Sequence, residues 1–307
     1  MENSRKFAID IGGTLAKVAY LDQDEPASDL DFRTSYGTIH LAVFQSRDID
    51  QTIGFLKNLG FNSKELPVTG GGAYKFSSEL ERELHTTVIK VDEIQSLNAG
   101  FSEVLKEVPE PAYTFSIERG KQSVVPRPLP SLLCNIGSGV SIIKLEEERI
   151  SRVTGTCLGG GTCLGLATAI LGIESYEELL ELCQHGNANN TDLLMSDIYG
   201  SGYPDTLAVS LGKIAMKDTN EFQRADIAKS LLNMVGYNIG QIAYLATKLE
   251  KTDHVYFAGN FIRGYEYTMD RINYSVEYWS QGKTTALFLK HDGYFGALGA
   301  LLKVLNQ

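Results

Sequence analysis

The sequence has little cysteine and few positive charges. Its four cysteines form no CxxC pair: Cys134, Cys157, Cys163 and Cys183. This pattern argues against a disulfide framework or a cysteine-rich zinc site, and it favours reduced thiols in a cytoplasmic protein. Lys and Arg together number 28 against 38 Asp and Glu, a net charge of −10. We therefore expect no nucleic-acid partner, and an anionic ligand would need a local positive site.

The chain also has no typical membrane-spanning run. Phe7 to Ile9 are followed at once by Asp10, too early for the apolar core of a signal peptide. Residues 153–173 carry no charge, but these 21 positions include six glycines and four threonines. Such a run predicts a buried glycine turn followed by a helix, so we expect no membrane span.

The 307 residues, 43% of them hydrophobic, are enough for two folded domains. Residues 6–20 predict a β-hairpin turning at Gly12-Gly13, where a glycine permits positive φ, and residues 132–145 predict another. A strand ending in glycine follows each hairpin, LPVTGGG after the first and VYFAGN after the second. The pattern predicts a duplicated α/β domain with a cleft between the two copies.

The helix signals fit this scheme. Ser175 and Glu178 form a possible capping box, and residues 226–249 have apolar side chains at near-helical spacing. Pro126, Pro128 and Pro130 precede the second hairpin. We therefore expect one domain over residues 1–128 and another over 129–307.

Neither a GxxxxGK[ST] loop nor a GxGxxG motif is present. Two facing glycine hairpins could instead present backbone N–H groups to the phosphates of one nucleotide. The two turns are DIGGT at residues 10–14 and NIGSG at residues 135–139. Taken singly, either is equally well explained as an ordinary hairpin turn.

Several strings together resemble one family, from about Phe7 to Leu302. They are DIGGT, TGGGAYKF, NIGSGVS, RVTGT followed by LGGGT, DIYG, GNFIR and ALFLKHDGYFGALGALL. They look like the eukaryotic-type (type II) pantothenate kinases of the actin, hexokinase and sugar-kinase superfamily. The resemblance implies two actin-like (ribonuclease H-like) α/β domains with an active-site cleft between them. It also implies a homodimer that uses ATP and Mg²⁺ to phosphorylate the pantothenate 4′-hydroxyl, the first step of coenzyme A synthesis, under inhibition by acetyl-CoA or another acyl-CoA.

In the first domain, the resemblance makes Glu93 the catalytic acidic residue, although Asp92-Glu93 also fits an ordinary helix start. Asp10 would orient Mg²⁺ or its waters. The alternative interpretation of Asp10 is a hairpin residue that pairs with Lys17. Lys17 could reach a phosphate or be a solvated strand residue. The nucleotide-binding residues expected here are Asp10, Gly12, Gly13, Thr14 and Lys17.

In the second domain, the resemblance makes Arg152 the arginine that holds pantothenate or acyl-CoA, a use that suits its fork of donors. The other substrate or acyl-CoA positions expected are Ser138, Ser141 and Trp279. The nucleotide positions expected are Gly137, Gly139, Gly160, Gly161, Gly259, Asn260 and Arg263. We expect the glycine triplet at residues 159–161 to present unpaired helix N–H groups to a ligand, and its ordinary alternative is close packing of a helix on a strand. The ordinary alternatives for the other positions are turn glycines, a surface position for Arg263 and a core position for Trp279.

Met216 lies near the position of a family tyrosine, and KSLLNM and NIGQIA resemble a pseudokinase-like branch. That branch lacks both the acidic residue and the arginine, whereas this chain has Glu93 and Arg152. Two alternatives stay open beside the pantothenate kinase: a catalytically weak regulator that binds coenzyme A thioesters, and a sugar kinase of the same superfamily.

Overall fold

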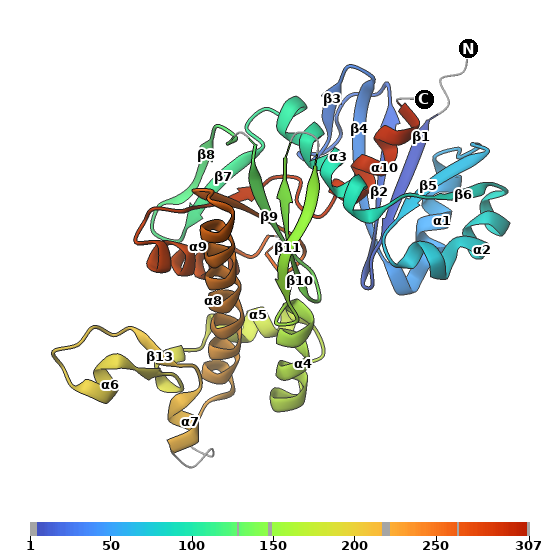
Figure 1. The fold of residues 1–307 in the computed structure, drawn as a ribbon. Coiled ribbons are helices and arrows are strands. Elements are labelled where there is room, and N and C mark those ends of the chain that lie inside the picture. The colour runs from blue at the N-terminus through green and yellow to red at the C-terminus, as the bar shows by residue number, and fades with distance from the viewer. Residues whose placement is uncertain (1–4, 128, 147–148, 217–221, 263, 306–307) are drawn as a thin grey trace.

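The computed structural model describes residues 5–127, 129–146, 149–216, 222–262 and 264–305, and it contains two large sheets (Figure 1). The elements of the first part of the chain are β1 (Lys6–Ile11), β2 (Leu15–Asp22), β3 (Phe32–Thr34), β4 (Gly37–Gln45), η1 (Ser46–Asp48), α1 (Ile49–Asn58), β5 (Glu65–Thr69), α2 (Gly72–Leu84), β6 (Thr87–Lys90), α3 (Glu93–Glu107), β7 (Ala112–Ser116) and β8 (Gly120–Val124).

The elements of the remaining chain begin with the second hairpin. They are β9 (Ser131–Ile136), β10 (Val140–Leu145), β11 (Ile150–Thr156), α4 (Gly160–Leu171), α5 (Tyr176–Gln184), η2 (Ala188–Asn190), β12 (Leu193–Leu194), α6 (Met195–Tyr199), β13 (Leu207–Val209), α7 (Gly212–Met216), α8 (Arg224–Glu250), β14 (His254–Ala258), α9 (Glu266–Ser280), β15 (Thr285–Leu289) and α10 (Phe295–Leu305).

Both predicted hairpins form, and each begins a sheet of the same design. The first sheet has the order β3-β4-β2-β1-β5-β6, and the second has β11-β10-β9-β14-β15-β7-β8. In both sheets the hairpin strands are antiparallel, and the later strand ending in glycine lies parallel to the first hairpin strand. This repeated order confirms the prediction of a duplicated α/β domain, because each copy places its hairpin turn at the carboxyl ends of its parallel strands.

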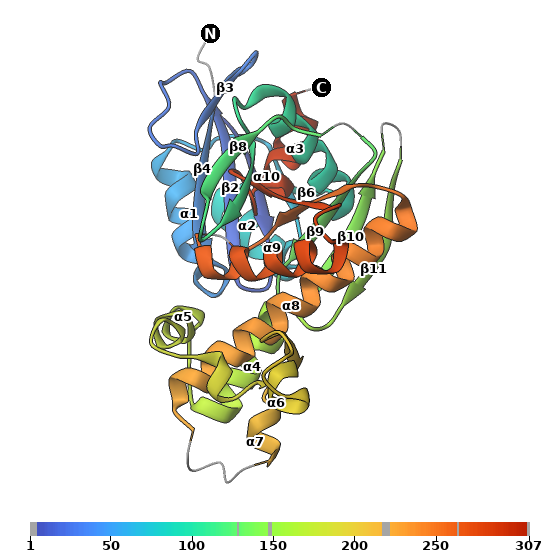
Figure 2. The ribbon, with the colours of Figure 1, turned by 90° about the vertical axis from the view of Figure 1, so that its left-hand side faces the viewer.

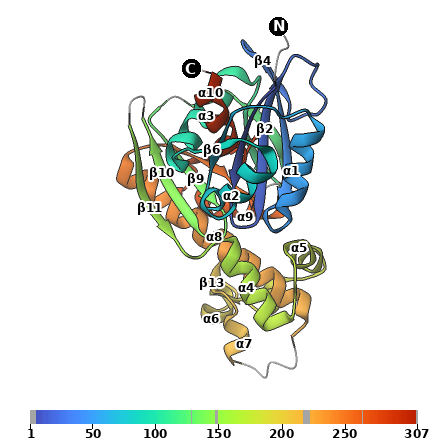
Figure 3. The same ribbon diagram turned by 90° about the vertical axis from the view of Figure 1, so that its right-hand side faces the viewer.

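Helices separate the two sheets and cover their outer faces. Helices α3 and α10 pack against each other between the sheets, in a core formed by residues from both, including Ala8, Phe101, Tyr256 and Leu298. Helices α1 and α2 pack on the far face of the first sheet, and α8 and α9 on the far face of the second. Figure 1 shows this succession of layers, and Figure 3 shows α1 and α2 beside the strands of the first sheet.

The predicted domain boundary between residues 128 and 129 stays a prediction, but two observations on the sheets bear on it. Strands β7 and β8 precede that position, yet β7 pairs with β15 in the second sheet. Helix α10 lies near the end of the chain, far beyond this boundary, yet it packs against β1 and β5 of the first sheet. The chain therefore passes between the two halves more than once.

The segment from α4 to α7 and the adjoining end of α8 project away from both sheets (Figure 2). The uncharged run of residues 153–173 becomes the end of β11, a glycine turn and helix α4, as predicted. Ser175 caps α5 by accepting a hydrogen bond from the Glu178 N–H at 3.1 Å. None of the helices among the described residues is long and apolar enough to cross a membrane.

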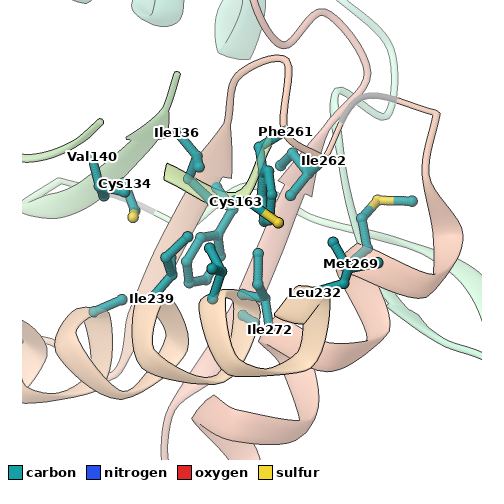
Figure 4. Packing of buried hydrophobic residues seen from close by; sticks show 14 of the residues in the cluster. Cys134, Ile136, Val140, Cys163, Leu232, Ile239, Phe261, Ile262, Met269 and Ile272 are labelled. Carbon is teal, nitrogen blue, oxygen red and sulfur yellow. The ribbon is translucent and has the colours of Figure 1, made fainter. Parts of the chain in front are cut away.

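The core of the second half lies directly beneath its glycine turn. Ile136 and Val140 flank that turn and are buried with Phe261, Leu232 and Ile239 (Figure 4). Burial of such side chains stabilises the fold by about 1.5–3 kcal/mol each. All four cysteines are free, in line with the expectation of reduced thiols, and Cys134, Cys163 and Cys183 are buried.

Candidate active site

Asp10 and Lys17 lie opposite each other on the two strands of the first hairpin. Lys17 Nζ is 3.8 Å from Asp10 Oδ2, and less than a fifth of either side chain is exposed. Burial raises the pKa of the Asp10 carboxyl, and the Lys17 charge opposes this effect. The pairing of Asp10 with Lys17 is therefore confirmed, whereas a role of Asp10 in orienting Mg²⁺ stays a prediction.

Glu93 is the first residue of α3, and Asp92 caps the helix by accepting a hydrogen bond from the Gln95 N–H at 2.8 Å. The ordinary helix-start interpretation is thus confirmed, but it does not exclude a catalytic role. Partial burial raises the pKa of Glu93, the Asp10 charge raises it further, and Lys17 lowers it. The structure therefore brings Glu93 into electrostatic contact with Asp10 and Lys17, although the three residues are far apart in sequence.

A surface pocket of about 370 Å³ opens beside Glu93 at the carboxyl ends of β5 and β6. Its lining includes Gly70, Gly71 and Lys90. The sequence analysis does not include these residues among the expected site residues, although the string TGGG is part of the family resemblance. Ligands of α/β sheets commonly bind in the crevice at this edge.

Lys17 also faces the second half of the molecule. An ideal Cβ at Gly293 would lie 3.6 Å from Asn260 Oδ1 and 3.9 Å from Lys17 Nζ, so the three residues meet. The Asn260 oxygen is buried, and none of the described residues donates a hydrogen bond to it. Because burying an unpaired polar atom is costly, this oxygen is suited to bind a ligand.

The second hairpin turn borders another pocket, which we call the Arg152 pocket, of about 470 Å³. It is lined by Asn135, Gly137, Ser138, Gly139, Val140, Ser141, Arg152, Gly155, Thr156 and Cys157. Sequence reasoning had proposed Ser138, Ser141 and Arg152 for one ligand, and the fold brings them together. It had missed Cys157, an exposed thiol that directly follows the RVTGT string.

Arg152 is exposed on β11, and among the described residues no carboxylate forms an ion pair with it. An added Cβ at Gly155 would lie 2.9 Å from an Arg152 guanidinium nitrogen, so this glycine leaves room for the side chain. The fork of donors is therefore open toward the pocket, where it can bind a carbonyl, carboxylate or phosphate.

Two expectations about the glycines are wrong. Gly12 and Gly13, at the turn of the first hairpin, do not have positive φ. The N–H groups of Gly160 and Gly161 are not unpaired either, since they donate to the carbonyls of Gly137 and Ser138, both at 2.9 Å. Added Cβ atoms at these two positions would lie within 3.0 Å of the same turn. The glycine triplet thus packs the start of α4 against the second hairpin, as the close-packing alternative proposed.

Gly259 directly follows β14 and has φ of 113°, and a Cβ there would lie 2.3 Å from the Ile136 carbonyl oxygen. The glycine is therefore required for β14 to approach the second hairpin closely. Arg263 lies outside the described residues. The nucleotide binding predicted for the glycines and Thr14 stays a prediction: Gly12, Gly13, Thr14, Gly137, Gly139, Gly160, Gly161 and Gly259.

Trp279 does not line the Arg152 pocket. It belongs to a cluster of aromatic rings on α8 and α9, which we call the aromatic face: Tyr237, Tyr274, Tyr278 and Trp279. Tyr274, Tyr278 and Trp279 are each about two-fifths exposed. Within one chain, the proposed substrate role of Trp279 therefore has no support.

The donor set fits a magnesium ion held mostly through water and phosphate. Among the described residues, no group of three or more His, Cys, Asp or Glu side chains could hold a metal. Asp10 nevertheless offers a carboxylate that accepts no hydrogen bond from the described residues, and Mg²⁺ typically binds one or two carboxylates together with substrate phosphates.

The two sheets of repeated strand order, with helices between and outside them, have the two-domain α/β fold of the actin-like ATPases and sugar kinases. A glucokinase of the ROK family from Streptomyces griseus, solved with glucose and AMPPNP, aligns with a TM-score of 0.55 at 11% identity over 99% of this chain and all of its own. Component A of (R)-2-hydroxyglutaryl-CoA dehydratase from Acidaminococcus fermentans aligns with a TM-score of 0.57 at 14% identity, covering 97% of this chain and 96% of its own.

The particular family is shown by sequence. The model of the Fumble family matches residues 6–303, and the chain belongs to this family, that of the eukaryotic-type pantothenate kinases. Similar proteins include pantothenate kinase 1 of Arabidopsis thaliana, 39% identical over 98% of this chain and 86% of its own length. The pantothenate kinase of Schizosaccharomyces pombe is 35% identical over 97% and 81%.

A 4′-phosphopantetheine phosphatase of Mus musculus is 38% identical over all of this chain. The chain spans only 42% of the length of that mouse relative.

Proposed function

We propose that this protein is a pantothenate kinase that transfers the γ-phosphoryl group of ATP to the 4′-hydroxyl of pantothenate. The observation that supports this most strongly is that Glu93 lies within electrostatic range of the Asp10–Lys17 pair in a chain of the Fumble family. The reaction would be the first step of coenzyme A synthesis, and the free thiols agree with a cytoplasmic location.

Glu93 would accept the proton of the pantothenate hydroxyl as its oxygen bonds to the γ-phosphorus and the bond to the ADP oxygen breaks. The raised pKa of Glu93 suits this role, because a base near the working pH is the more effective one. Lys17 would bind a phosphate as a point charge between the two halves. Mg²⁺, when bound beside Asp10, would offset negative charge on the phosphates.

A pocket of about 550 Å³ between the two halves could take the nucleoside end of ATP. Its walls include Ile262 and Gly264, just after the predicted nucleotide residues Gly259 and Asn260. Its lining includes Leu289, the last residue of β15, and Asp292, which precedes Gly293 in the chain, and a Cβ at Gly293 would lie 3.9 Å from Lys17 Nζ. This placement would let the base and the phosphates occupy neighbouring parts of one cleft.

The Arg152 pocket would bind pantothenate, and acetyl-CoA or another acyl-CoA would inhibit by placing its pantetheine arm there. The guanidinium of Arg152 and the hydroxyls of Ser138 and Ser141 support this, since they are hydrogen-bonding groups along one pocket. Shared use of one pocket would make inhibition competitive with pantothenate.

We further propose a homodimer formed through the aromatic face. Large aromatic side chains in contact with one another, and about two-fifths exposed, are typical of interfaces. In such a dimer, Trp279 could approach the pocket of the partner. Trp279→Glu should then yield monomers in analytical ultracentrifugation, whereas the same change at exposed Tyr74 on α2 should not.

One assay tests the reaction. ADP release is measured with Mg²⁺ and pantothenate, with hexoses, or with no acceptor, and acetyl-CoA binding is measured by calorimetry. The proposal requires release that depends on pantothenate. Acetyl-CoA binding without turnover would instead indicate a regulator, and turnover with hexoses would indicate a sugar kinase. The regulator is worth testing because one similar protein, from mouse, is named as a phosphatase and not as a kinase.

A further inference from the structure

The Asp10 carboxylate lies in a narrow space between two glycines. An ideal Cβ at Gly70 would lie 2.6 Å from Asp10 Oδ1, and one at Gly296 would lie 2.7 Å from Asp10 Oδ2. Real Cβ atoms do not approach oxygen so closely, so either side chain would have to displace its neighbour. Gly70 comes from the β5–α2 turn and Gly296 from the first turn of α10.

The two glycines differ in what else constrains them. Gly70 has φ of 82°, and its Cβ would also lie 2.6 Å from the Ile11 carbonyl oxygen. A side chain there is disfavoured by the backbone alone. Gly296 lies within a helix without positive φ, and its three nearest contacts are all atoms of the Asp10 side chain: Oδ2, Cγ and Cβ.

A helical glycine is costly by itself, since alanine is about 0.5–1 kcal/mol more favourable at an interior helix position. The backbone of α10 does not require a glycine at position 296, since φ is not positive there. What the missing side chain leaves free is room for the Asp10 carboxylate, whose Oδ2 atom is also the oxygen that lies 3.8 Å from Lys17 Nζ.

We propose that Gly296 is a positioning residue, which keeps the Asp10 carboxylate beside Lys17 in the orientation that phosphoryl transfer uses. This inference rests on the proposed function, in which Asp10 acts at the phosphates. In Gly296→Ala the methyl group meets the movable end of a side chain rather than backbone. The fold therefore tolerates the substitution, and the carboxylate moves.

Two matched glycine variants define what the same substitution does elsewhere. Gly54 lies in α1 with no atom within 4 Å of its Cβ position, so Gly54→Ala leaves activity unchanged and the fold equally or more stable. Gly299 lies one turn after Gly296, but its Cβ would lie 1.8 Å from the Ser96 carbonyl oxygen on α3. Gly299→Ala therefore destabilises the packing of α3 against α10.

The experiment measures melting temperature without ligands, kcat, and ATP affinity by calorimetry with and without Mg²⁺. For Gly296→Ala we expect a melting temperature close to that of the wild type and a kcat roughly 10- to 100-fold lower, because small misplacements cost that much. Mg²⁺ should enhance ATP affinity less than in the wild type. Unchanged kcat together with an unchanged effect of Mg²⁺ would overturn the inference.

The Asp10→Ala background separates this inference from the proposed function. If Asp10→Ala itself remains active, the proposed role of Asp10 is wrong. If Asp10→Ala is inactive, adding Gly296→Ala should cause no further loss of Mg²⁺-dependent ATP binding. Should Gly296→Ala alone melt much earlier, the double variant should regain that stability, since the carboxylate is gone. A failure to regain it would show that the methyl group meets something else.

Discussion

The most decisive perturbation is Glu93→Gln, which removes the proposed base and keeps the size of the side chain. General base catalysis typically contributes about 10²- to 10⁴-fold. At 1.36 kcal/mol per factor of ten, the barrier should rise by about 3–5 kcal/mol. The measurement is kcat from ADP release at saturating pantothenate, ATP and Mg²⁺.

The structure limits the accompanying change in stability. Glu93 occupies the first turn of α3, where losing a negative charge costs about 0.3–1 kcal/mol. Two features offset this cost: the Asp92 cap remains, and repulsion between Glu93 and Asp10 disappears. The melting temperature should therefore shift by only a few degrees. Glu103→Gln, a half-buried position on the same helix, is the matched control and should keep wild-type kcat.

The pH profile gives an independent check of Glu93. Burial and the charge of Asp10 raise the pKa of Glu93 in the folded enzyme, and the base must be ionised to accept a proton. Activity should therefore be lost as pH falls through a value above that of an ordinary glutamate, and the glutamine variant should lack this acid limb. A Glu93→Gln enzyme within a few-fold of wild type, or one that retains the limb, would refute the role of Glu93.

Three further predictions concern the two hairpins. Arg152→Lys keeps the charge but loses the fork, so the KM for pantothenate should rise about 10- to 100-fold and acetyl-CoA should inhibit less, whereas unchanged acetyl-CoA affinity would remove Arg152 from the site. In Gly137→Ala the new Cβ would lie no closer than 3.9 Å to another residue, so the melting temperature should not change. The methyl group would instead crowd the phosphates expected at this turn, and ATP affinity should fall roughly tenfold. Equal losses of melting temperature and ATP affinity would indicate an ordinary hairpin turn. Asp10→Asn should abolish activity yet raise the melting temperature at pH 7. Burial raises the pKa of Asp10, so the folded state binds the carboxyl proton more tightly than the unfolded state does. The contribution of Asp10 to stability therefore declines as the pH rises above the ordinary pKa range of aspartate. Equal melting temperatures at pH 7 would contradict that account.

Much of the fold could be predicted from local pattern. Alternating apolar residues around Gly12-Gly13 and Gly137 predicted both hairpins, and the spacing of apolar residues predicted α8, because each pattern depends on neighbours in the chain. The sequence could not show that β7 and β8 join the second sheet or that α10 lies against the first. Those positions depend on which apolar faces remain uncovered after the sheets form.

The candidate site divides in the same way. Motif resemblance by itself determined the family and the identity of Glu93, Asp10 and Arg152 as candidates, since such strings need no knowledge of distance. Only the tertiary structure decided that Glu93 shares the field of Asp10 and Lys17, that the N–H groups of Gly160 and Gly161 are already used, and that Gly296 borders a carboxylate 286 positions earlier. The physical reason is that charge coupling, hydrogen bonding and steric exclusion act over a few ångströms of space, and a linear sequence specifies those distances only after the chain has folded.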